Sequence, residues 1–177
     1  MENSNQETIS NLIGNPVLQM RKNHALEHAV IHVLEKKFPG RQLMGYSICN
    51  GFWIIGNLSI QNVQEAVDAA FARLSHGEKN LAIHEGCGTN LATTGVLASV
   101  AALLTLAGTK SEKERLRRFS SLVLMTCAFV QISKPLGFAM QRNVTTDADM
   151  DGMKIMGIDM SEICGFQCFF VTTGFNG

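Results

Sequence analysis

The amino-acid sequence predicts an α+β fold, in which a small sheet packs with an N-terminal amphipathic helix and carries an inserted two-helix transmembrane hairpin. Three patterns support this prediction. Apolar residues recur at helical spacing after Asn15-Pro16, strand-like segments flank Asn50-Gly51, and two long runs in the second half are almost free of charge. The expected parts are an α+β portion over residues 15–90, the hairpin over 91–141 and C-terminal strands over 142–177.

The first expected element is a helix from residue 15 to about residue 37, preceded by a tail over residues 1–14. Asn is a favoured N-cap and Pro a favoured first helical residue, while Phe38-Pro39-Gly40 forbids continuation. One side of this helix is apolar, with Leu26, Ala29, Val30, Val33 and Leu34. The other side carries His24, His28, Ile31 and Glu35, flanked by Glu27 and His32.

The segments around residues 42–60 predict a β-hairpin, because Asn-Gly between two apolar segments is a strong hairpin signal. Residues 61–75 return to helical spacing, and residues 79–84 are expected to form a short strand that leads into a Gly-rich turn. The segments 153–158 and 166–173 are expected to be strands that complete the same sheet.

The two apolar runs, over residues 91–108 and 119–141, predict an antiparallel transmembrane hairpin. Eighteen residues is at the lower limit of a membrane-spanning helix. The alternative is a buried helical hairpin in a soluble core. Small residues within the first run favour close helix packing in a membrane; they are Gly95, Ala98, Ser99 and Ala101.

Charge bounds the expected location and partners. The chain has 15 basic and 15 acidic residues, so it offers no general attraction to nucleic acid. The five scattered cysteines do not form a disulfide pattern, which favours a reducing compartment. The linker between the apolar runs is basic and favours a cytoplasmic linker, but that would require export of the N-terminal part without a signal peptide. We therefore expect the soluble portion to lie in the cytosol, with the lipid bilayer as partner.

The segment His24-Ala25-Leu26-Glu27-His28 has the H-x-x-E-H spacing of a metallohydrolase helix. Residues four apart lie on one helix face, so two imidazoles can bind one zinc or another divalent ion, and the intervening Glu can activate a bound water. The alternative is an exposed helix face on which His and Glu side chains only contact one another.

A catalytic zinc needs a third protein ligand, and the segment Ile83–Asn90 offers ligand types. His84 is the preferred candidate and Cys87 the second. Otherwise the glycines simply form a turn, Cys87 packs, and Asn90 caps the next helix. His32 and Asp147 are additional candidates, although packing at the edge of the core and a solvated loop are the simpler roles for them.

The chain contains RKNHALEHA at 21–29, GFWIIGN at 51–57, CGTNL at 87–91, KPLG at 134–137 and NVTTD at 143–147. Together these segments resemble an uncharacterised family of small bacterial membrane proteins, common in cyanobacteria and other phototrophs. The resemblance implies attachment to a bacterial inner or photosynthetic membrane but no reaction. Related sequences carry His-Pro-x-Cys-Gly-Thr-Asn where this chain has His84-Glu85-Gly86-Cys87, so the resemblance does not support Glu85 as a ligand.

The function predicted from these observations is that of a membrane-attached zinc hydrolase. His24, His28 and His84 would bind the ion and Glu27 would activate the water, with a membrane-proximal peptide, a lipophilic ester or a pigment as substrate. One alternative is a non-catalytic assembly or accessory protein of a membrane complex, such as a photosynthetic one, whose His face binds a tetrapyrrole metal or a partner. The other is tetrapyrrole modification, which rests on the phototroph association alone.

Overall fold

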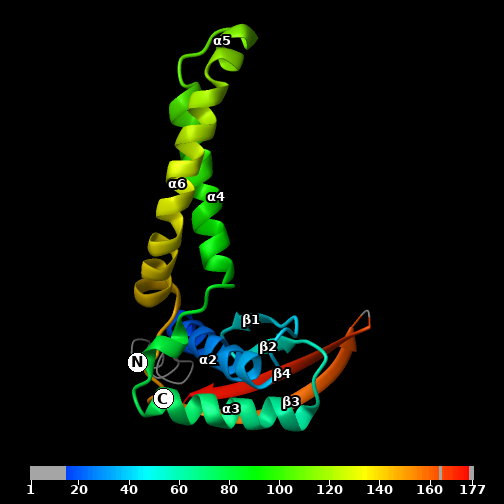
Figure 1. Ribbon diagram of the computed structural model, residues 1–177. Helices are drawn as coiled ribbons and strands as arrows, with labels where there is room; N and C mark the ends of the chain where they lie inside the picture. Colours follow the sequence, from blue (N-terminus) through cyan, green and yellow to red (C-terminus); the bar gives the residue numbers. More distant parts are fainter. Residues whose placement is uncertain (1–14, 164, 176–177) are drawn as a thin grey trace, which may run out of the picture. The chain divides into compact units, whose positions relative to one another are not determined.

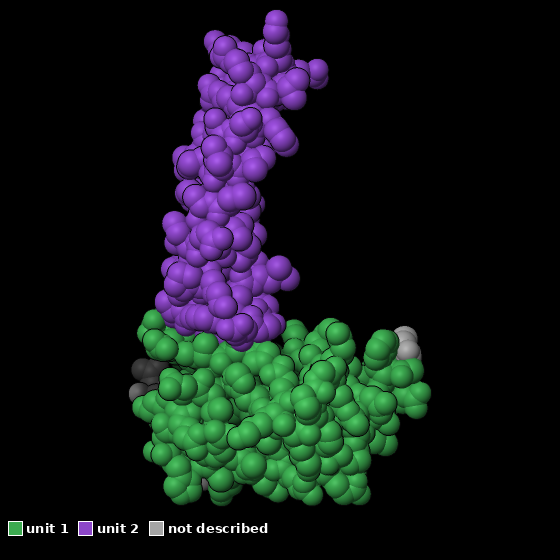
Figure 2. Space-filling model, in the orientation of Figure 1, with its two compact units in different colours: residues 1–84, 142–177 green, residues 85–141 purple. Residues whose placement is uncertain are grey.

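The computed structural model describes residues 15–163 and 165–175, and the tail expected over residues 1–14 lies outside this range. The chain divides into two compact units (Figure 2). Unit 1 comprises residues 1–84 and 142–177, and unit 2 comprises residues 85–141.

Helix α2 spans Pro16–Lys37 and carries most of the candidate ligands. The side-chain oxygen of Asn15 accepts hydrogen bonds from the backbone N–H groups of Val17 (3.0 Å) and Leu18 (3.4 Å), which satisfies two donors at the helix start. At the other end Phe38 is the C-cap, and Gly40 has a positive φ of 82°. The predicted start and end of this helix are therefore confirmed.

Unit 1 contains one antiparallel sheet made from both ends of the chain (Figure 1). Its strands are β1 (Met44–Ile48), β2 (Gly51–Ile55), β3 (Met153–Ile163) and β4 (Phe166–Phe175), in the order β1-β2-β4-β3. Ile48 pairs with Gly51, so the hairpin predicted at Asn50-Gly51 is confirmed. β2 also pairs with β4, and the rings of Trp53 and Phe170 lie 4.7 Å apart across that pair.

The core of unit 1 lies between the sheet and two helices that pack against each other, α2 and α3 (Ile60–Ser75). The largest fully buried apolar side chains come from both helices and from the two central strands; they are Phe52, Phe169, Leu26, Leu34, Ile54, Val30, Val63, Val67 and Val171. The sheet and the apolar face of α2 therefore form a rigid support for the opposite, His-rich face of that helix.

The strand expected over residues 79–84 is wrong. Lys79–Ala82 instead form a short 3₁₀ helix, η1, and Ile83 follows in an extended conformation. The physical reason is that this segment packs against α2, where imidazole groups bind the carbonyl oxygens of Ala82 and Ile83. Those carbonyls therefore pair with side chains, whereas the sheet is built from the four strands named above.

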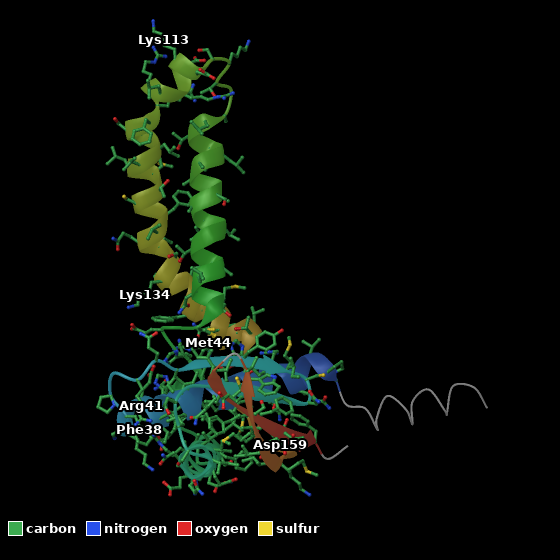
Figure 3. All side chains as sticks on the ribbon, turned by 90° about the vertical axis from the view of Figure 1, so that its right-hand side faces the viewer. Phe38, Arg41, Met44, Lys113, Lys134 and Asp159 are labelled. Atoms are coloured by element: carbon green, nitrogen blue, oxygen red, sulfur yellow. The ribbon has the colours of Figure 1, made fainter. Side chains whose placement is uncertain are left out.

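Unit 2 is a helical hairpin. It contains α4 (Gly88–Leu106), the short α5 (Glu112–Arg117) and α6 (Phe119–Met140), and the chain leaves it through a π-helical turn, η2, over Gln141–Thr145. Figure 3 shows α4 and α6 side by side, with Lys113 at the loop end and Lys134 towards the opposite end. Thr94 donates a hydrogen bond to Ser133 across the helix pair (2.8 Å), and a Cβ on Gly137 would overlap Asn90. Small residues thus allow the two helices to pack closely.

Both long helices of this hairpin have the length and composition to cross a membrane: Gly88–Leu106, and the continuous stretch Phe119–Thr145. Their large apolar side chains lie mainly on the outer surface, with exposed fractions of 77% for Leu91, 72% for Leu103 and 71% for Leu124. The length, composition and exposed apolar side chains of these helices allow membrane association.

Candidate metal centre

The His-rich face of α2 packs against the rest of unit 1. His28 is 1% exposed and Glu27 is 4% exposed, while His24 and His32 are partly buried. The alternative of an exposed helix face is therefore wrong for this part of the helix. This face is covered because η1 and the last residue of η2, Thr145, place their carbonyl oxygens against the imidazole rings.

Four histidine rings form a row along α2. The ring centroids of His24 and His28 are 4.4 Å apart, those of His28 and His84 are 5.8 Å apart, and those of His84 and His32 are 4.8 Å apart. The rings of the three histidines predicted as ligands thus lie in this row, with His84 between His28 and His32. Their role in binding metal stays a prediction.

Backbone carbonyls orient the first two rings of the row. The Nδ1 atom of His24 lies 2.9 Å from the carbonyl oxygen of Thr145, and Nδ1 of His28 lies 2.7 Å from that of Ala82. A carbonyl only accepts hydrogen bonds, so Nδ1 carries the proton in both rings, and the neutral form has its lone pair on Nε2. Donation of one ring N–H to a carbonyl is the usual arrangement of histidines that bind metal through the other nitrogen.

Glu27 is held between α2 and β1. Its Oε2 accepts a hydrogen bond from the Ser47 hydroxyl (2.7 Å), and its carboxylate lies against the backbone of Gly45. Burial raises the pKa of Glu27 above its ordinary value, and this effect outweighs the Ser47 hydrogen bond and the charges of His24 and His84, which lower the pKa. A carboxyl with a raised pKa is suited to accept and return a proton near neutral pH.

The close approach of β1 to Glu27 requires glycine at position 45. A Cβ there would overlap the Glu27 carboxylate, so we expect Gly45→Ala to displace it and to lower the free energy of unfolding by about 1–3 kcal/mol. Chemical denaturation in mild detergent measures this. Gly157→Ala on β3 is the matched control, because a Cβ at Gly157 has nothing within 4 Å. Equal stability of the two variants would contradict the expected overlap.

The raised pKa of Glu27 also predicts how stability depends on pH. The folded state holds the proton more tightly than the unfolded chain, so this contribution is complete below about pH 4.5 and is lost as pH rises through the folded-state pKa. In the metal-free protein, thermal unfolding midpoints should therefore fall with rising pH more steeply than those of Glu27→Gln. Parallel curves for the two proteins above pH 4.5 would show that Glu27 does not titrate as expected.

His84 also pairs with a residue that was not predicted as a ligand. Its Nε2 lies 3.2 Å from Oε1 and 3.1 Å from Oε2 of Glu35. His32, expected at the edge of the core, is partly buried and places its Nε2 2.8 Å from the carbonyl oxygen of Ile83. Glu35 could have been noticed in the sequence, since it lies three residues after His32 on the same helix face.

Cys87 and Asp147, the remaining sequence candidates, each accept a hydrogen bond within their own segment. Cys87 belongs to unit 2, where its Sγ accepts the backbone N–H of Thr89 (3.4 Å) at the start of α4. In unit 1 the Oδ1 of Asp147 accepts the backbone N–H of Asp149 (3.1 Å). The expected solvated loop thus has a defined turn at Asp147, while metal binding by Asp147 or Cys87 stays a prediction.

Comparison with known proteins identifies the family of this chain. The family model described as "Domain of unknown function (DUF6391)" matches residues 19–158. This range includes His84, the whole of unit 2 and the α2 residues of the candidate centre, which are His24, Glu27, His28, His32 and Glu35. The chain belongs to DUF6391. The chain is also similar to an uncharacterized protein of the cyanobacterium Picosynechococcus sp. (strain ATCC 27264 / PCC 7002 / PR-6), with 32% identity over 139 residues. That alignment covers 73% of this chain and 67% of its relative. No solved structure matches the chain.

Proposed function

We propose that this DUF6391 protein is a membrane-attached, metal-dependent hydrolase. His24, His28 and His84 would hold zinc or a similar divalent ion, and Glu27 would act as the general base. The observation that carries the proposal is the donation of Nδ1–H by both His24 and His28 to backbone carbonyls, because it fixes the tautomer that binds metal through Nε2.

Membrane attachment is the first part of the proposal. The lengths of α4 and α6 and the outward position of their large apolar side chains support it. His84 directly precedes unit 2 and Arg142 directly follows it. The candidate centre is therefore close in sequence to the proposed membrane span. We further propose that unit 1 lies on the cytosolic side of a bacterial inner or photosynthetic membrane.

The chemistry follows from the side chains in place. Bound zinc would supply a Lewis acid and lower the pKa of a coordinated water. Glu27, whose Oε2 accepts the Ser47 hydrogen bond, would take up a proton on its carboxylate and later return it to the leaving group. Burial of His28 and Glu27 strengthens electrostatic interactions within the centre.

A cavity in unit 1 of about 410 Å³ is a candidate substrate site. Its lining includes Ala82 and Ile83, whose carbonyls bind the α2 histidines, together with Arg21, Lys79 and Arg142. Asp147 and Asp149 add acidic groups to the lining, so the cavity would suit a polar group such as a peptide or ester carbonyl.

Metal content tests the proposal. Protein purified without a His tag in mild detergent and loaded with zinc should retain it, and His28→Ala should lose at least tenfold in zinc affinity at this centre. His76→Ala is the matched control, because the His76 ring lies at the end of α3, where it contacts the carbonyl of Ala72 (2.6 Å). Wild-type protein that binds no zinc would overturn the hydrolase and leave the accessory-protein alternative.

A further inference from the structure

A second group of donors lies beyond His28 on α2. The ligand-type atoms of His32, Glu35 and His84 all lie within 4.8 Å of one another. Two of these contacts are closer still, because Nε2 of His84 lies 3.1–3.2 Å from both carboxylate oxygens of Glu35. Ligand atoms around a tetrahedral zinc are roughly 3–4 Å apart, given metal–ligand distances of about 2.0–2.2 Å. This group is therefore close to the spacing that an ion requires.

The orientation of His32 also fits metal binding. Its Nε2 lies 2.8 Å from the carbonyl oxygen of Ile83 and so carries a proton, which leaves the lone pair of the neutral ring on Nδ1. Two imidazoles and one carboxylate form a frequent zinc donor set. A simple His–Glu ion pair would explain the contact between His84 and Glu35, but it would not involve His32.

The group can be reached from solvent. The side chain of Glu35 is 46% exposed and that of His84 is 14% exposed. Lys37, two residues after Glu35, pairs with Glu65 on α3. With neutral imidazoles the three side chains carry one net negative charge, which favours a cation.

We propose that His32, Glu35 and His84 form a second divalent-cation site, distinct from the centre of His24 and His28. The inference does not depend on hydrolase activity. It shares His84 with the first centre, so two ions bound at once would be bridged by this ring. Each ion would then bind one ring nitrogen, and the remaining N–H proton would pass to solvent. The first ion would lie on the His28 side of the ring and the second on the His32 side.

The test measures zinc binding after the first centre has been disabled. Two tag-free variants, His24→Ala and His28→Ala, serve as separate backgrounds in which the first centre is disabled. Each is dialysed against zinc in mild detergent, and bound metal is measured together with far-UV circular dichroism. Each background should retain one zinc. Adding Glu35→Gln or His32→Ala should weaken its binding at least tenfold, while adding Glu65→Gln, a control for a lost acidic side chain, should not.

The outcomes separate this site from the first one. If neither background binds zinc, and Glu35→Gln in the wild type leaves zinc binding unchanged, the second site is overturned and the first is favoured. If both backgrounds bind zinc, and adding Glu35→Gln abolishes that binding, the second site is supported. This holds even if the wild type binds a single ion and the hydrolase proposal fails. Loss with Glu35→Gln but not with His32→Ala reduces the group to a His–Glu pair and overturns the three-residue site.

Discussion

Glu27→Gln is expected to lower the rate of hydrolysis by about 10²–10⁴-fold while leaving bound zinc in place. The substitution removes the proton acceptor but keeps a side chain of the same size, which can still accept the Ser47 hydrogen bond. The imidazole ligands are unchanged. Turnover of chromogenic esters and fluorogenic peptides by zinc-loaded protein measures the rate, and elemental analysis measures the metal.

Glu65→Gln is the control for this prediction, since Glu65 is exposed on α3 and pairs with Lys37. It should change the rate by less than twofold. If Glu27→Gln also retains activity within twofold, Glu27 is not the base. If Glu27→Gln loses its metal together with its activity, the carboxylate acts on the ion itself and the assigned division of roles is wrong.

Val96→Arg is expected to reduce membrane insertion strongly. Val96 lies near the middle of α4 and is 63% exposed, so in the proposed arrangement its side chain faces lipid. An arginine at the centre of a spanning helix costs about 2.5–3.5 kcal/mol on insertion scales, which corresponds to roughly a hundredfold shift of the insertion equilibrium. The fraction of protein that resists carbonate extraction from expressing membranes measures this shift.

Met156→Arg on β3 is the matched control, because Met156 is 68% exposed but belongs to unit 1. It should remain in the membrane fraction like the wild type. In a protein without a membrane span, both arginines would simply face water and neither would change the fractionation. Release of the wild type by carbonate, or equal behaviour of the two variants, would overturn the hairpin as a membrane anchor.

Much of the fold could be predicted from local patterns. The Asn15-Pro16 cap and the Asn50-Gly51 turn are determined by a few neighbouring residues, and the structure has the helix and hairpin that they predict. The segment around η1 could not be predicted in this way. Its apolar residues fit a strand, but its carbonyls bind imidazole groups on a helix about fifty residues earlier in the chain.

The candidate site, too, could be predicted where local spacing decides the positions and not where tertiary packing does. Helical spacing alone places His24, Glu27 and His28 together, because residues three and four apart are neighbours on a helix. The position of His84 depends on how η1 packs, and its pairing with Glu35 was missed for that reason. The role of Ser47 was also missed, since it requires knowing which side of β1 faces α2.

The strand order has a consequence for how the protein is made. β2 pairs with β4, yet the whole of unit 2 lies between them in the sequence. During synthesis β1, β2 and the hairpin leave the ribosome before β4 does, so one edge of β2 stays open until that last strand emerges. Contacts between such distant segments form slowly. The nascent N-terminal half must therefore be shielded from aggregation, by a chaperone or by α2 and α3 alone, until β4 emerges and closes the sheet.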